Sequence, residues 1–175
     1  MAAMIYVLIL RFLHVVLGVF WGGAAMFLAW FLAPAVKASG PDGGKVMGAL
    51  NTQTRWPAVI ASAGGLTVLS GILLYARNWW PLLVSGQATG PAYGFLIGGI
   101  FGLAAIIFGG AGVGRLSTRV TTLGAEIASA GGPPDQNKLS EMAALQKQLE
   151  SASNINAILI VIAVIMMSIS RYLTF

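Results

Sequence analysis

The sequence predicts an all-α integral membrane protein in which one domain, residues 1–175, forms a bundle of four transmembrane helices. Hydrophobic residues make up 57% of the chain and charged residues 9%, whereas a soluble domain carries about 25% charged residues. The mean hydropathy is +0.83. Four segments without Asp or Glu reach the about 20 apolar residues that a membrane helix needs: residues 4–36, 57–76, 93–113 and 155–173.

The first span, residues 4–36, is long enough to tilt in the bilayer or to extend beyond it. The connection after it contains SGPDGGK, residues 39–45, which predicts a turn, and then a short polar stretch. Pro57 follows in the first turn of the second span, where its missing N–H costs little. The second connection carries Trp79 and Trp80, and paired tryptophans beside a span are typical of interfacial anchors.

The third connection predicts a helical hairpin over residues 115–152 that extends spans three and four. Apolar residues recur there at helical spacing on both sides of the turn GGPPDQN: Leu116, Val120, Leu123 and Ile127, then Leu139, Met142, Leu145 and Leu149. The hairpin would be about 20–25 Å long at a rise of 1.5 Å per residue. Two roles stay open, a solvated extension without a ligand and a docking arm for another subunit.

The cations predict the orientation in the membrane, because positively charged connections stay in the cytoplasm. The first and third connections hold most of them: Lys37, Lys45, Arg55, Arg115, Arg119, Lys138 and Lys147. The opposite side holds Arg77 and Arg171. The hairpin is therefore expected in the cytoplasm and both termini outside. An excess of basic residues on such a chain serves topology, so no nucleic-acid partner is expected.

Glycines recur at four-residue spacing on the spans, as in Gly18 and Gly22, or Gly94, Gly98 and Gly102. Small residues let membrane helices approach closely. This pattern fits close packing within one bundle, a face cleared for a flat cofactor, or contact with a second protomer.

The one histidine, His14, lies inside the first span, and an ionisable side chain at membrane depth is a functional-site hypothesis. Arg11 precedes it by one turn, and Gly18 and Trp21 follow it by one and two turns. Counting 1.5 Å per residue along antiparallel spans brings His14 level with Met166 and Met167. The same count brings Arg11 level with Arg171.

Three interpretations of His14 stay open. A b-type haem fits, because His or a His/Met pair are axial ligands of haem iron, and Arg11 and Arg171 would then pair with the propionates. Copper fits second, with Met166 and Met167 as thioether ligands. In the third interpretation His14 forms a hydrogen bond to a neighbouring span, at Thr67 or Ser70, while the methionines pack and the arginines reach the headgroups.

The sequence favours a protein that is not an enzyme. It has no cysteine, which excludes thiolate metal sites and cysteine nucleophiles. All Asp and Glu residues lie in the connections, so a Ser/His/Asp site and a proton relay within the membrane are not supported. The run GGAGVGR ends a span and lacks the strand–loop–helix context of a phosphate-binding loop.

The stretch RFLHVVLGVFWGGAAMFLAWFLAPAV, residues 11–36, resembles the first span of the copper-resistance protein D superfamily, which is similar to the membrane protoporphyrinogen oxidases of bacteria. Residues 54–77 resemble the second span of these proteins, and the whole chain resembles an uncharacterised family of four-span bacterial membrane proteins. This resemblance implies a bundle in the bacterial inner membrane that handles haem or copper at His14. The oxidases carry further histidines in their spans, so here a bis-histidine haem would need a ligand from another protomer or subunit.

These observations lead to a ranked expectation of function. The first is a small b-type haem-binding membrane protein or subunit for electron transfer or haem handling, with His14 as axial ligand. The second is a non-catalytic accessory subunit of a larger membrane complex, in which His14 only forms a hydrogen bond. Copper transport is the third. Expected partners are the lipid bilayer and either a second copy of the chain or a larger membrane complex.

Overall fold

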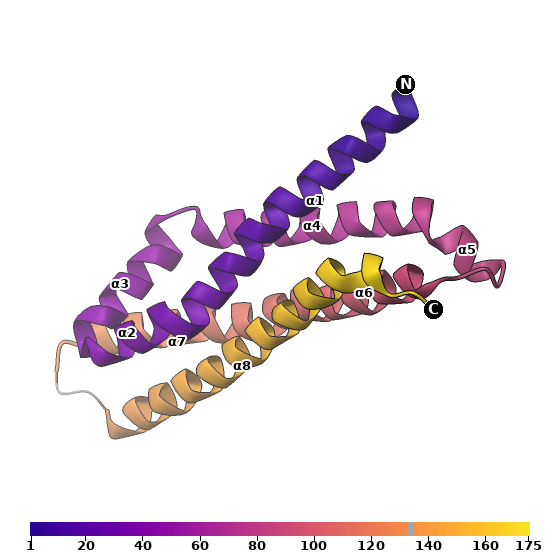
Figure 1. Cartoon of the computed structure of the whole chain (residues 1–175). Coiled ribbons are helices and arrows are strands. Elements are labelled where there is room, and N and C mark those ends of the chain that lie inside the picture. Colours follow the sequence, from indigo (N-terminus) through magenta and orange to yellow (C-terminus); the bar gives the residue numbers. More distant parts are fainter. Residues whose placement is uncertain (133–134) are drawn as a thin grey trace.

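The computed structural model describes residues 1–132 and 135–175, and within these residues every regular element is helical. Figure 1 shows the helices in chain order. Their bounds are α1 Ala2–Phe27, α2 Ala33–Ala38, α3 Gly40–Gln53, α4 Trp56–Asn78, α5 Trp80–Val84, α6 Gly90–Phe108, α7 Arg115–Ser129 and α8 Gln136–Ile169. Two π-helical segments, η1 Leu28–Leu32 and η2 Gly109–Gly114, and one 3₁₀ turn, η3 Ser170–Tyr172, join them.

Four continuous helical stretches are long and apolar enough to cross a membrane, as the sequence predicted: Ala3–Ala38, Trp56–Asn78, Gly90–Ser129 and Gln136–Tyr172. All four are longer than the predicted spans, and the third and fourth include the helices of the hairpin. The first and third stretches continue through the π-helical segments η1 and η2 without a break in the helix. Both π-helical segments contact α8.

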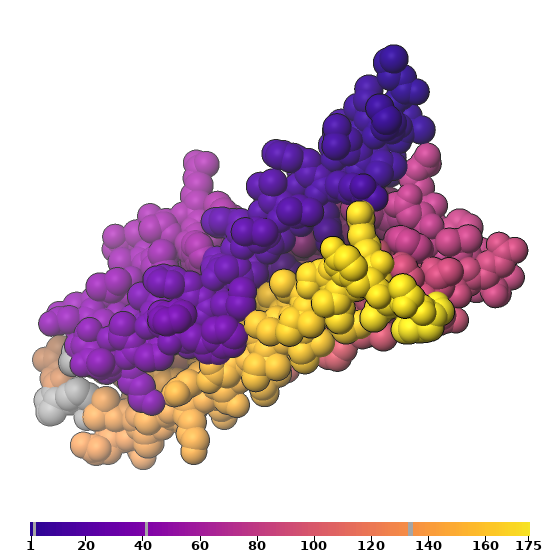
Figure 2. Space-filling model, in the orientation of Figure 1, coloured from indigo at the N-terminus to yellow at the C-terminus, as the bar shows by residue number. Residues whose placement is uncertain are grey.

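The helices form a closed set of four contacts. α1 packs against α4, α4 against α6, α6 against α8, and α8 returns to α1. The N-terminal part of α1 leaves this bundle and projects beyond it (Figure 1), and the space-filling view shows it as a separate arm (Figure 2). Large apolar side chains cover the outside, including Phe12, Val19 and Phe31, which are 64%, 72% and 65% exposed. Such a surface is suited to lipid rather than to water.

The first connection is a helix rather than the predicted turn and polar stretch. The turn is confined to Gly40, whose φ of +60° reverses the chain after α2, a backbone conformation that glycine adopts without strain. α3 then begins at once and includes the rest of SGPDGGK. A Cβ at Gly43 would collide with the Val36 carbonyl oxygen. This glycine is therefore required by the close approach of α2 and α3 and is not the turn residue that its place in SGPDGGK predicted.

The predicted hairpin is confirmed as a pair of helices, in which α7 lies beside α8. The apolar stripes face each other, with Leu123 and Leu145 buried. A salt bridge of 3.0 Å joins Lys138 of α8 to Glu126 of α7. Of the predicted GGPPDQN turn, Pro133 and Pro134 lie outside the described residues.

Two further contacts connect the hairpin to the first connection, which the sequence analysis did not foresee. The Asn51 amide donates a hydrogen bond of 3.1 Å to the Ser117 hydroxyl, between α3 and α7. Lys37, at the end of α2, forms a 3.1 Å salt bridge with Glu150 of α8. α3 and the hairpin therefore form one end of the molecule together.

Glycines on α6 determine how closely it approaches α8. A Cβ at Gly98 would lie 3.2 Å from both Met166 Cβ and Met167 Cγ. One turn away, a Cβ at Gly94 would lie 2.6 Å from the hydroxyl of the fully buried Ser170. Neighbouring side chains thus fill the space that these two glycines leave, as the close-packing interpretation expected.

The substitution Gly98→Leu is expected to separate α6 from α8 and to lower the melting temperature of the purified protein in detergent. Overpacking of this kind costs about 1–3 kcal/mol. The matched control is Gly99→Leu, because nothing lies within 4 Å of a Cβ at Gly99. Equal melting temperatures for the two variants would contradict this account of the α6–α8 contact.

Candidate functional site

His14 lies on α1 where this helix crosses α4. Its Nδ1 is 2.8 Å from the backbone carbonyl oxygen of Thr67. A carbonyl oxygen only accepts, so Nδ1 carries the proton, and in the neutral ring Nε2 keeps a free lone pair. This contact is one of the alternatives that the sequence left open, a hydrogen bond from His14 to the second span at Thr67. The same carbonyl accepts a second hydrogen bond, 3.0 Å long, from the Ser70 hydroxyl.

The imidazole ring rests directly on the backbone of α4 at Gly71. A Cβ at this position would lie 2.7 Å from His14 Cε1 and 3.0 Å from Nδ1. Real Cβ atoms essentially never approach that closely. The imidazole therefore packs against the backbone at Gly71, and any other residue at this position would displace the ring.

Two more contacts of the same kind follow along α1. A Cβ at Gly18 would lie 3.3 Å from the Thr67 methyl group, and a Cβ at Gly64 would lie 3.0 Å from the indole of Trp21. One turn after Gly18, a Cβ at Gly22 would lie 3.1 Å from Ile160 of α8. The sequence analysis named Gly18 and Trp21 as residues around a cofactor. The structure gives both of them packing contacts with α4.

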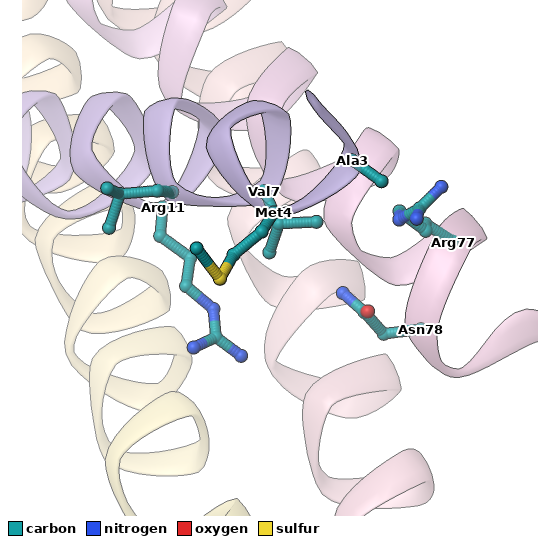
Figure 3. Close-up of a pocket in the computed structure, with 7 residues that line it drawn as sticks. Ala3, Met4, Val7, Arg11, Arg77 and Asn78 are labelled. Atoms are coloured by element: carbon teal, nitrogen blue, oxygen red, sulfur yellow. The ribbon is translucent and has the colours of Figure 1, made fainter. Parts of the chain in front are cut away.

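Beyond the His14 contact, α1 and α4 diverge and a cleft of about 400 Å³ opens between them. We call it the arginine cleft, and seven residues line it: Ala3, Met4, Val7, Leu8, Arg11, Arg77 and Asn78. In Figure 3, Arg11 reaches down from α1 into the space that Asn78 of α4 also faces, and Arg77 lies beside Ala3. Both arginine side chains are exposed.

Arg11 was predicted to lie level with Arg171, with both as partners of haem propionates, and this stays a prediction. In the structure Arg11 lines a cleft with Arg77. Arg171 is exposed on η3, after the end of α8, and it is not one of the residues that line the cleft. Arg77 and Asn78 were missed as site residues. The same depth count would have found them, because Asn78 follows Gly71 by seven residues while Val7 precedes His14 by seven.

Met166 and Met167 pack against α6 at Gly98, as described above. Within residues 1–132 and 135–175 there is no group of three or more His, Cys, Asp or Glu side chains that could hold a metal ion. For a haem, the residues offer one imidazole and the guanidinium of Arg11. A second axial ligand from Met166 or Met167 stays a prediction.

Asn156 of α8 is a buried polar residue that the sequence analysis did not single out. It is 7% exposed, and its Oδ1 has no hydrogen-bond partner among the described residues. The amide lies against η2, where a Cβ at Gly109 would be 3.3 Å from Oδ1. The sequence feature that could have identified it is an asparagine near the start of a predicted apolar span.

Comparison of the chain with protein-family models, with curated proteins and with solved structures finds no match.

The substitution Gly71→Ala is expected to lower the melting temperature, because its methyl group would displace the imidazole and break the bond to Thr67. Hydrogen bonds between membrane helices contribute on average about 0.6 kcal/mol, and the steric displacement adds to that loss. Gly65→Ala is the matched control on the same helix, since nothing lies within 4 Å of a Cβ there. It should be neutral or stabilising, because Ala is a better helix former than Gly.

A second change separates the imidazole from other causes. In the double variant His14→Ala/Gly71→Ala the collision is gone, so Gly71→Ala should cost less in the His14→Ala background than in the original chain. If Gly71→Ala lowered the melting temperature equally in both backgrounds, the imidazole of His14 would not be packed against Gly71.

Proposed function

We propose that this protein is a non-catalytic accessory subunit of a larger membrane complex and that α1 is its docking helix. One observation carries this proposal: an apolar groove on the outside of α1 with an open glycine, Gly23, at its centre. We further propose the bacterial inner membrane as its location, with both termini outside and the hairpin in the cytoplasm. The distribution of the cations supports this orientation.

The groove has a volume of about 500 Å³. Its lining comes from α1, η1, α3 and α4: Val19, Phe20, Gly23, Ala24, Phe27, Leu28, Leu32, Leu50 and Trp56. Nothing lies within 4 Å of a Cβ at Gly23. At the preceding residue, Gly22, the side chain of Ile160 occupies the corresponding space. Small residues on an open helix face let a second helix approach closely in the membrane. The groove therefore suits an apolar helix of another subunit.

His14 supports this function by fixing α1. Its hydrogen bond to Thr67 and its seat on Gly71 hold the inner face of α1 against α4. The outer face, with the groove around Gly23, is then presented in a constant orientation. In this role the one histidine contributes to architecture and takes no part in a reaction.

The substitution Gly23→Leu is expected to detach the protein from its complex without unfolding it. The leucine would occupy the groove, and the fold should tolerate it because the space is open. Gly65→Leu is the matched control, since Gly65 is equally open but lies on α4 away from the groove lining. The measurement is native gel electrophoresis and size-exclusion chromatography after extraction from the native membrane with a mild detergent.

The original chain and Gly65→Leu should migrate in one defined larger assembly, and Gly23→Leu should migrate alone. The proposal is wrong if the original chain migrates alone, or if Gly23→Leu stays in the assembly.

A b-type haem at His14 is the second candidate function, for electron transfer or haem handling. The observation that favours it is the hydrogen bond from Nδ1 to a backbone carbonyl, since metal-bound histidines usually donate their other N–H in this way. His14 would be an axial ligand and Arg11 would pair with a propionate. A haem would supply one-electron transfer there. Copper at His14 with Met166 or Met167 is the remaining alternative.

An absorption spectrum of protein purified from haem-supplied cells tests this candidate. A bound haem should give a Soret band that is lost in both His14→Ala and His14→Gln, because glutamine keeps an N–H donor for Thr67 but is not a usual haem ligand. No Soret band in the original chain would contradict the haem candidate, and metal analysis of the same sample tests copper.

A further inference from the structure

We propose that the arginine cleft binds the phosphate headgroup of an anionic phospholipid. The cleft is bordered by Arg11 on α1 and by Arg77 and Asn78 at the end of α4. It lies at the opposite end of α1 from the groove around Gly23, so the two surfaces can be tested separately.

The charge of the cleft is the first argument. Two guanidinium groups line it and no carboxylate does. The three salt bridges found in the described part of the chain all use lysines elsewhere, at Lys37, Lys45 and Lys138. Guanidinium groups bind phosphate through paired, charge-assisted hydrogen bonds. Arg11 and Arg77 take part in none of these salt bridges, so either guanidinium group can bind a phosphate.

The polar partner of the arginines is Asn78. Its Nδ2 donates a 2.8 Å hydrogen bond to the Leu74 carbonyl of the preceding turn. This bond orients the side chain and leaves the amide oxygen to accept from a headgroup hydroxyl. The cleft thus offers donors for a phosphate and an acceptor beside them.

The rest of the cleft is apolar, which selects a lipid over a free phosphate. Ala3, Met4, Val7 and Leu8 of α1 form this wall, and Met4 and Leu8 are 73% and 67% exposed. Farther along α1, Phe12 and Val15 are exposed in the same way. An acyl chain attached to a phosphate at Arg11 would run toward the centre of the bilayer along Leu8, Phe12 and Val15, whereas free phosphate would gain nothing from this apolar surface.

The position of the cleft along the helices also fits a headgroup. Arg77 lies in the last turn of an apolar helix that is long enough to cross a membrane. Trp79 and Trp80 follow directly, and tryptophans gather at the level of the headgroups. The long side chain of Arg11 reaches that level from within its span.

The test compares lipid retention by native mass spectrometry of haem-free protein reconstituted with equal amounts of phosphatidylglycerol and phosphatidylcholine of the same chain length. The original chain should retain phosphatidylglycerol preferentially. The double variant Arg11→Gln/Arg77→Gln should lose that preference by about tenfold, because each basic residue near a membrane surface contributes to the attraction of anionic lipid. Both residues are exposed, so the fold is expected to persist, and the melting temperature verifies it.

The matched control is Arg55→Gln/Arg115→Gln, which removes the same charge at the other end of the bundle from residues that are also exposed. It should keep the preference for phosphatidylglycerol. An equal loss in both double variants would overturn the proposal, because the attraction would then come from net charge alone. Displacement of the lipid by inorganic phosphate at equal concentration would also overturn it, since the apolar wall would then contribute nothing.

Discussion

Where α1 crosses α4, side chains of one helix lie on the backbone of the other, and the arrangement of the whole bundle follows from this close approach. The imidazole of His14 occupies the space above Gly71 and the indole of Trp21 the space above Gly64. In a bilayer, apolar burial supplies little force between helices, so van der Waals contact at glycines has to supply it. α6 and α8 are in the same kind of contact, because side chains from the C-terminal end of the chain pack against α6 at Gly94 and Gly98.

Most polar side chains in the bundle form hydrogen bonds within their own helix, and His14 and Asn156 are exceptions. Thr67 and Ser70 donate to carbonyls of their own helix. Only His14 uses its side chain to bond α1 to α4, among the hydrogen bonds of the described residues. Asn156 is left with an unpartnered oxygen beside the π-helical segment η2. An unmade hydrogen bond of a buried group costs about 1–3 kcal/mol, so this contact is a weak point between η2 and α8.

The two hollows of the surface lie at different places along α1 and differ in chemistry. The groove around Gly23 is apolar and borders the middle of the first long helix. The arginine cleft combines two guanidinium groups with an apolar wall near the N-terminus. His14 lies between them and fixes the helix that forms part of both. The two surfaces proposed to bind other molecules are thereby separate from the contacts that hold the bundle together.

Composition and periodicity alone determined the all-helical architecture, the four long apolar helices and the hairpin, because burial in lipid and helical spacing leave a direct record in the order of residues. In SGPDGGK, Gly40 makes the predicted turn but Gly43 was misread, since a glycine needed for close approach to Val36 looks the same in sequence as one needed for a turn. The sequence left open whether His14 binds a haem, binds copper or forms a hydrogen bond at Thr67 or Ser70. Only the tertiary structure selected Thr67 as the partner of His14 and opened a cleft between Arg11 and Arg77, because the rotation and tilt of packed helices decide which of the groups at one depth come into contact.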